Sequence, residues 1–152
     1  MPFSLYLTDM DKIYILVAED DADDRFLLET AFAEKGFSEK LTFVENGVEL
    51  LEHLRKKDTT LNDTENQLPG FILLDLNMPK KDGREVLKEI KADPRFKKIP
   101  VIVFTTTRNE KDIHNCYELG ANTYVIKPVG FESLLQTIED IRTYWFKTAR
   151  IP

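Results

Sequence analysis

The stretch Phe71-Ile72-Leu73-Leu74-Asp75 joins four apolar residues to a carboxylate, and Leu76-Asn77-Met78-Pro79 and Asp82-Gly83 follow at once. A short apolar run in front of turn residues is typical of a strand buried on both faces. A carboxylate at the end of such a strand is held at the edge of a sheet, where it can act as a nucleophile or metal ligand. The local pattern equally fits an Asp that only caps the following turn.

The rest of the chain alternates between strand and helix patterns. The predicted strands are residues 13–18, 41–44, 71–75, 100–104 and 123–126. Helical spacing appears around 26–32, 48–54, 85–92 and 112–119, and in a long last helix marked by Leu134, Ile138, Ile141 and Trp145, while 56–67 reads as a polar loop. Five alternations predict an α/β fold, with a parallel sheet covered by helices on both faces. In such folds ligands gather at the carboxyl ends of the strands.

The composition fits one domain and excludes several classes of protein. The chain has 152 residues, of which 42% are hydrophobic and 32% charged, and its net charge of −6 argues against nucleic-acid binding. It has no apolar stretch long enough to span a membrane and no secretory signal pattern, so we expect no membrane partner. The single Cys116 excludes an internal disulfide and fits a reducing cytoplasm, and the two histidines lie too far apart in sequence to suggest a zinc site.

Polar side chains follow the predicted strands at their carboxyl ends. Glu19 and Asp20 follow the first strand, Asp75 the third, Thr105 the fourth and Lys127 the fifth. Carboxylates that converge need a cation or take up protons, and oxygen ligands favour a hard ion such as Mg²⁺. A lysine and a hydroxyl opposite them suit a phosphoryl group, and Asp is a nucleophile toward such groups. The set therefore predicts an aspartyl phosphate on Asp75, formed with Mg²⁺.

The acidic run continues to Asp23 and Asp24, and for these two residues we prefer a simpler interpretation. Acids in the first turn of a helix are stabilised by the positive end of the helix dipole.

These residues resemble the receiver domain of two-component response regulators. The matching segments, in order along the chain, are ILVAEDD (15–21), ILLDLNMPKKDG (72–83), PVIVFT (100–105) and GANTYVIKP (120–128). The resemblance implies a flavodoxin-like (βα)5 doubly wound sandwich with a five-stranded parallel sheet in the order 2-1-3-4-5. It covers residues 12–146, which we expect to form the receiver domain, with 1–11 as an extension and 147–152 as a tail.

The resemblance also implies roles for the strand-end residues. Asp75 looks like the phosphoacceptor, Glu19 and Asp20 like the acid pair, with Asp20 as the more direct Mg²⁺ ligand, and Asn77 offers its carbonyl to the ion. Lys127 looks like the phosphate-binding lysine. Glu19 stands at a position where other family members have Asp. It is a common variant and should still help to bind the ion.

A switch pair is implied as well. Thr105 is the hydroxyl that moves toward the phosphoryl group, and Tyr124 is the aromatic residue that swings inward with it. Alternatively, Tyr124 is simply an amphipathic tyrosine on a half-exposed strand, without a switching role. Thr106 stands where the family prefers a smaller residue, which restricts access to the site, and the Lys127–Pro128 bond is expected to be cis.

The loop 56–67 and the ending 141–152 resemble small single-domain regulators paired with bacterial phytochrome-type histidine kinases. We expect such a kinase as phosphodonor and no enzymatic role beyond assisting the chain's own phosphorylation and dephosphorylation. No output domain is expected, so the signal passes to a protein partner through the surface formed by the helix 112–119, the strand 123–126 and the last helix.

Three consecutive aromatics near the end, Tyr144, Trp145 and Phe146, predict an interface. Helical spacing turns only one or two of them to the core, and the others leave an apolar patch. We expect a homodimer through the helix 112–119 and the last helix; alternatively, residues 1–11 fold over these side chains.

Three rival functions remain open. An aspartyl-phosphate phosphatase or phosphotransferase would need a carboxylate two residues after the nucleophile, where Asn77 stands. A flavin binder would need a Gly- and hydroxyl-rich loop after the first strand, in place of the acids found there. A degenerate receiver that only binds is disfavoured by the complete set of Asp20, Asp75, Thr105 and Lys127.

Overall fold

The computed structural model describes residues 14–37, 40–58 and 68–148. The strands are β1 (Tyr14–Ala18), β2 (Lys40–Val44), β3 (Phe71–Leu74), β4 (Val101–Thr105) and β5 (Thr123–Ile126). The helices are α2 (Ala22–Glu34), α3 (Gly47–Asp58), α4 (Gly83–Ala92), α5 (Glu110–Glu118) and α6 (Phe131–Arg142), which continues into the π-helical segment η2 (Thr143–Thr148).

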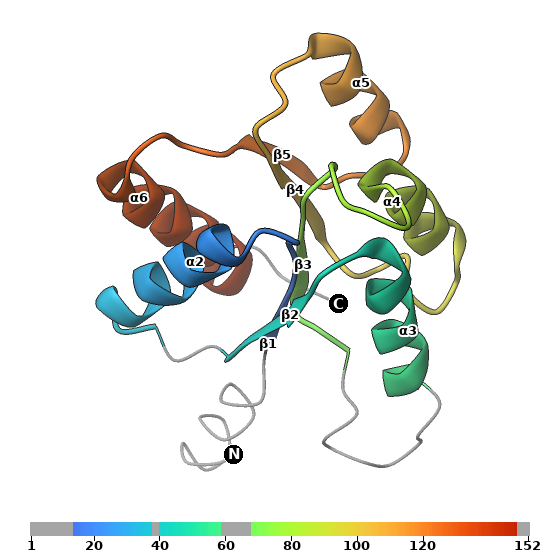
Figure 1. Ribbon diagram of the computed structural model, residues 1–152. Coiled ribbons are helices and arrows are strands. Elements are labelled where there is room, and N and C mark those ends of the chain that lie inside the picture. The colour runs from blue at the N-terminus through green and yellow to red at the C-terminus, as the bar shows by residue number, and fades with distance from the viewer. Residues whose placement is uncertain (1–13, 38–39, 59–67, 149–152) are drawn as a thin grey trace.

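The five strands form one parallel sheet in the order β2-β1-β3-β4-β5. Helices α2 and α6 cover one face, and α3, α4 and α5 cover the other (Figure 1). The predicted fold and strand order are therefore confirmed. The order changes direction between β1 and β3, so the carboxyl ends of these strands border the crevice where such sheets place their chemistry.

Two apolar layers hold the sheet between the helices, because alternate residues of a strand point to opposite faces. In β3, Phe71 and Leu73 belong to the layer with α2 and α6. Ile72 and Leu74 belong to the layer with α3, α4 and α5. All four are buried, which explains why this strand is continuously apolar.

Side-chain caps fix where the helices begin. Asp21 caps α2 by accepting hydrogen bonds from the backbone N–H groups of Asp23 and Asp24, Asp82 caps α4, and Asn109 caps α5. Each cap satisfies backbone donors that have no partner within the helix. As a result α4 and α5 begin two residues before their predicted starts.

The loop prediction 56–67 is wrong at its beginning. Helix α3 continues to Asp58, and basic residues fill its last turn, where they complement the negative end of the helix dipole. The remainder of that prediction, residues 59–67, lies outside the described residues, as do 1–11.

The long last helix is interrupted. Helix α6 ends at Arg142, and the wider π-helical turn that follows brings neighbouring side chains closer together around the axis. Trp145 and Phe146 both pack against the α2/α6 layer, with the Phe146 and Phe71 ring centroids 5.0 Å apart. Tyr144 remains 52% exposed. None of the helices within the described ranges is long and apolar enough to cross a membrane.

Candidate functional site

Asp75 lies directly after β3, where the sheet fixes its backbone. Its N–H donates to the Ala18 carbonyl at 3.2 Å, and only 8% of the residue is exposed. One carboxylate oxygen, Oδ1, accepts from the Asn77 N–H at 3.3 Å, and the other accepts from Lys127. The carboxylate is thus a nearly buried group held in one orientation.

Gly83 allows the following helix to start against this backbone. A Cβ atom there would lie 2.4 Å from the Asp75 carbonyl oxygen and 2.7 Å from the Leu76 Cα. The Gly83 N–H donates to the Leu76 carbonyl at 2.9 Å. The Asp82-Gly83 pair therefore caps α4 with its first residue and lets α4 approach Asp75 with its second.

Three carboxylates meet at the carboxyl edge of the sheet. Glu19, Asp20 and Asp75 each offer an oxygen, and these atoms all lie within 4.8 Å of one another. Glu19 is 3% exposed, and Asp20 is exposed. Burial raises the pKa of Glu19 to about 7, and the neighbouring charge of Asp75 adds to this, while the hydrogen bond from Lys127 opposes it. Such a set of oxygen ligands with mutual repulsion fits a divalent cation.

Lys127 is the counter-charge of this cluster. Its Nζ donates to Glu19 Oε2, to Asp24 Oδ2 at 3.1 Å and to Asp75 Oδ2 at 3.3 Å. Burial alone would lower the pKa of Lys127, but the hydrogen bond to Glu19 and the charges of Asp75 and Glu19 raise it above its ordinary value. The ammonium is therefore a permanent charge.

The Lys127–Pro128 peptide bond is trans, so the expectation of a cis bond is wrong. Trans is the favoured isomer of X–Pro bonds.

Thr105 closes β4 beside this cluster. It is fully buried, and its hydroxyl has no hydrogen-bond partner among the described residues. Its carbonyl accepts from the Lys127 N–H at 2.8 Å. A buried hydroxyl without a partner is costly, so this group is prepared to bond an acceptor that enters the site.

Asn77 and Tyr124 meet at Thr107, two residues after Thr105. The Asn77 side-chain amide donates to the Thr107 hydroxyl at 3.3 Å. The half-buried Tyr124 donates its hydroxyl to the Thr107 carbonyl at 2.8 Å. Thr106, which lies between Thr105 and Thr107 in the sequence, is exposed. A chain of hydrogen bonds thus runs from the Asp75 loop to Tyr124.

The structure does not bring every predicted site residue to this edge. Tyr144, Trp145 and Phe146 lie away from the cluster, because Phe146 packs on Phe71 at the opposite end of β3.

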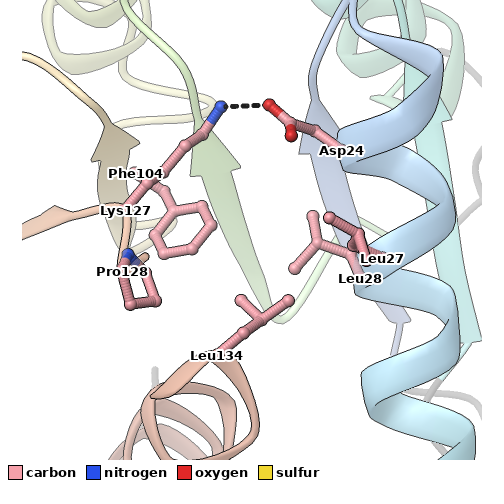
Figure 2. A pocket seen from close by; sticks show the side chains of 7 residues that line it. All are labelled: Asp24, Leu27, Leu28, Phe104, Lys127, Pro128 and Leu134. Atoms are coloured by element: carbon pink, nitrogen blue, oxygen red, sulfur yellow. Dashed lines mark hydrogen bonds and ion pairs between the residues drawn. The ribbon is translucent and has the colours of Figure 1, made fainter. Parts of the chain in front are cut away.

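Asp24 belongs to the cluster, although its position predicted only a helix start. It lies in the first turn of α2 and also contacts Lys127 (Figure 2). The local sequence does not distinguish Asp24 from Asp23, because the helix dipole stabilises an acidic residue at either position in the first turn.

Comparison with known proteins agrees with this geometry. The family model described as the response regulator receiver domain matches residues 15–139. The probable methanogenesis regulatory protein FilR2 of Methanothrix harundinacea is 37% identical over 142 residues, covering 93% of this chain and 89% of that protein.

Two cyanobacterial response regulators, Rcp1 and RcpA, are also similar. The chain is 37% identical to response regulator Rcp1 of Synechocystis sp. over 141 residues, which cover 93% of each. The solved Mn²⁺-bound form of Rcp1 superposes with a TM-score of 0.78 and covers 92% of this chain and 99% of that one. The phosphorylated cyanobacterial phytochrome response regulator RcpA superposes with a TM-score of 0.82 at 40% identity, covering 92% and 98%. The chain therefore belongs to the response regulator receiver domain family.

Proposed function

We propose that this receiver domain accepts a phosphoryl group on Asp75 from a histidine kinase. The observation that carries the proposal is the direct contact of Lys127 with Asp75 inside a cluster of three carboxylates. A nucleophilic carboxylate, an oxygen-ligand set and a fixed positive charge are the parts that phosphoryl transfer requires.

The transfer follows from these positions. A carboxylate oxygen of Asp75 attacks the phosphorus of a phosphohistidine, the O–P bond forms as the P–N bond breaks, and the imidazole nitrogen leaves with the electron pair and takes up a proton. Glu19, Asp20, Asp75 and the Asn77 carbonyl would hold a divalent cation, which would supply positive charge for the phosphoryl oxygens. Lys127 binds another of these oxygens.

The signal then passes through Thr105 and Tyr124. The hydroxyl of Thr105 gains the phosphoryl group as an acceptor, and this biases Tyr124 away from its bond to the Thr107 carbonyl. The surface of α5, β5 and α6 changes, and a protein partner reads it. The alternative of an aspartyl-phosphate phosphatase lacks support, because the exposed Asn77 carries no acid or base.

The donor we propose is a phytochrome-type kinase, since the similar RcpA is a cyanobacterial phytochrome response regulator. We assign residues 12–146 to the receiver unit, with 1–11 and 147–152 flanking it. The packing of Phe146 into the core supports the second boundary.

The test is phosphorylation by acetyl phosphate, followed as the mass of the intact protein. Wild type is expected to gain one phosphoryl group only with Mg²⁺, and Asp75→Asn none. Asp20→Asn, which keeps the nucleophile, should react more slowly and require more Mg²⁺. Equal labelling of Asp75→Asn and wild type would refute the assignment.

A further inference from the structure

The Lys127 ammonium has as many carboxylate partners as it has protons. Glu19, Asp24 and Asp75 each accept one hydrogen bond from it. A lysine offers three donors and no more. A phosphoryl oxygen can therefore bind Lys127 only if one of these carboxylates gives up its place.

The three carboxylates differ in how readily they can leave. The Glu19 side chain is 3% exposed and its other oxygen accepts from the Asp21 N–H at 3.1 Å, and the Asp75 side chain is 10% exposed. The Asp24 side chain is 41% exposed. A released Asp24 returns to water at little cost, whereas a released Glu19 would stay buried and could not be solvated in the same way.

The surroundings keep Asp24 and Lys127 together until a competitor arrives. The pair lines a cavity of about 60 Å³ whose other walls come from α2, β4 and α6. Figure 2 shows the ion pair together with the side chains that form these walls. Apart from this pair its lining is apolar, formed by Leu27, Leu28, Phe104, Pro128 and Leu134. Apolar surroundings on one side strengthen a charge pair relative to one in open water.

We propose that Asp24 is a releasable counter-ion that competes with the phosphoryl group for Lys127 and thereby lowers the affinity of the site for that anion. The proposal rests on the proposed function. Asp24 acts through Lys127 and is a positioning residue. It makes the unphosphorylated state more stable without contributing to the chemistry.

The simpler role, an acid that only stabilises the start of α2, is tested by Asp23. Asp23 lies in the same first turn and carries the same charge, and its backbone N–H donates to the cap Asp21 at 2.8 Å. Asp23→Asn is thus a matched control for helix stability and net charge. Only Asp24→Asn removes a partner of Lys127.

The experiment is a titration with beryllium trifluoride, a stable mimic of the phosphoryl group, at saturating Mg²⁺, with the bound fluorides counted by ¹⁹F NMR. Asp24→Asn is expected to bind about threefold to fivefold more tightly than wild type, the range of a partly exposed ion pair. Asp23→Asn is expected to bind like wild type, and both variants should melt alike.

A second readout follows the lysine itself. The Lys127 ammonium protons should exchange with solvent faster in Asp24→Asn than in Asp23→Asn, because one of them has lost its charged acceptor and retains at most a weaker bond to a neutral amide. Equal affinities in the two variants, weaker binding by Asp24→Asn, or unchanged proton exchange would overturn the role of Asp24. Failure of wild type to bind, with Asp75→Asn no different, would overturn the phosphoacceptor assignment as well.

Discussion

Replacing Thr105 by valine is expected to stabilise the unphosphorylated protein while it disables the switch. The Thr105 side chain is fully buried at the end of β4, and its hydroxyl has no partner among the described residues. Valine has nearly the same shape and removes the polar group. Leaving a buried hydroxyl unbonded costs about 1–3 kcal/mol, so the free energy of unfolding should rise by about 1–2 kcal/mol.

The assay is urea unfolding followed by circular dichroism, without divalent cations and then with Mg²⁺ and beryllium trifluoride. A gain of this size raises the melting temperature by roughly 2–8 °C in a protein of this length. When the anion is bound, wild type gains a hydrogen bond from the Thr105 hydroxyl that the valine variant cannot make. The advantage of valine should therefore shrink or reverse.

Thr105→Ser is the matched control, because it keeps the hydroxyl and loses only a methyl group. We expect it to be less stable than wild type by about 1 kcal/mol and to respond to the anion like wild type. The reasoning is refuted if Thr105→Val is less stable than wild type without the anion, or if the anion stabilises all three proteins equally.

Three further perturbations test other parts of the site. Gly83→Ala should destabilise the protein by more than about 2 kcal/mol in urea unfolding and slow labelling by acetyl phosphate, because the new methyl group meets the Asp75 carbonyl; a fully stable, active variant would contradict this. Glu19 has its pKa raised to about 7 in the folded state, from 4.5, so its contribution to stability is greatest below about pH 4.5 and is lost as the pH rises through 7. Without divalent cations, unfolding free energy should thus fall by up to about 3 kcal/mol between pH 5 and pH 8, and Glu19→Gln should lack this slope. Since a cation favours the ionised carboxylate, Mg²⁺ should bind more weakly at pH 6 than at pH 8 by isothermal calorimetry, whereas equal affinities would count against Glu19 as a ligand. If the chain forms a homodimer through α5 and α6, as the sequence predicts, Tyr144 is the exposed member of the aromatic residues 144–146 and should contribute to the interface. Tyr144→Ala should then lower the mass measured by light scattering, and an unaltered mass would remove Tyr144 from the interface.

The sheet could be predicted from the sequence because its information is local. Residues 71–74 are apolar without interruption, and a strand buried on both faces needs that pattern. The residues at the strand ends then followed from topology, since parallel strands bring their carboxyl ends to one edge. Glu19, Asp20, Asp75 and Lys127 meet there for that reason.

What could not be predicted depends on the reach of individual side chains. The contact between Asp24 and Lys127 joins residues 103 positions apart, and Asp23 has the same local signal without the contact. The π-helical turn could not be predicted for a similar reason. The spacing of Ile138, Ile141 and Trp145 fits an α-helix, whereas the contact of Phe146 with Phe71 joins residues that are far apart in the sequence.

The close approach of Gly83 to the Asp75 backbone has a consequence for how such a protein can diversify. Gly83, the first residue of α4, lies so close to the Asp75 backbone that there is no space for a side chain. Substitutions at position 83 are therefore expected to disturb the phosphoacceptor. The exposed side chains of α5, such as Lys111 and Asn115, do not lie against the backbone of the site in this way. Substitutions on the surface of α5 can therefore change which protein partner binds, while the phosphoryl-transfer site stays the same.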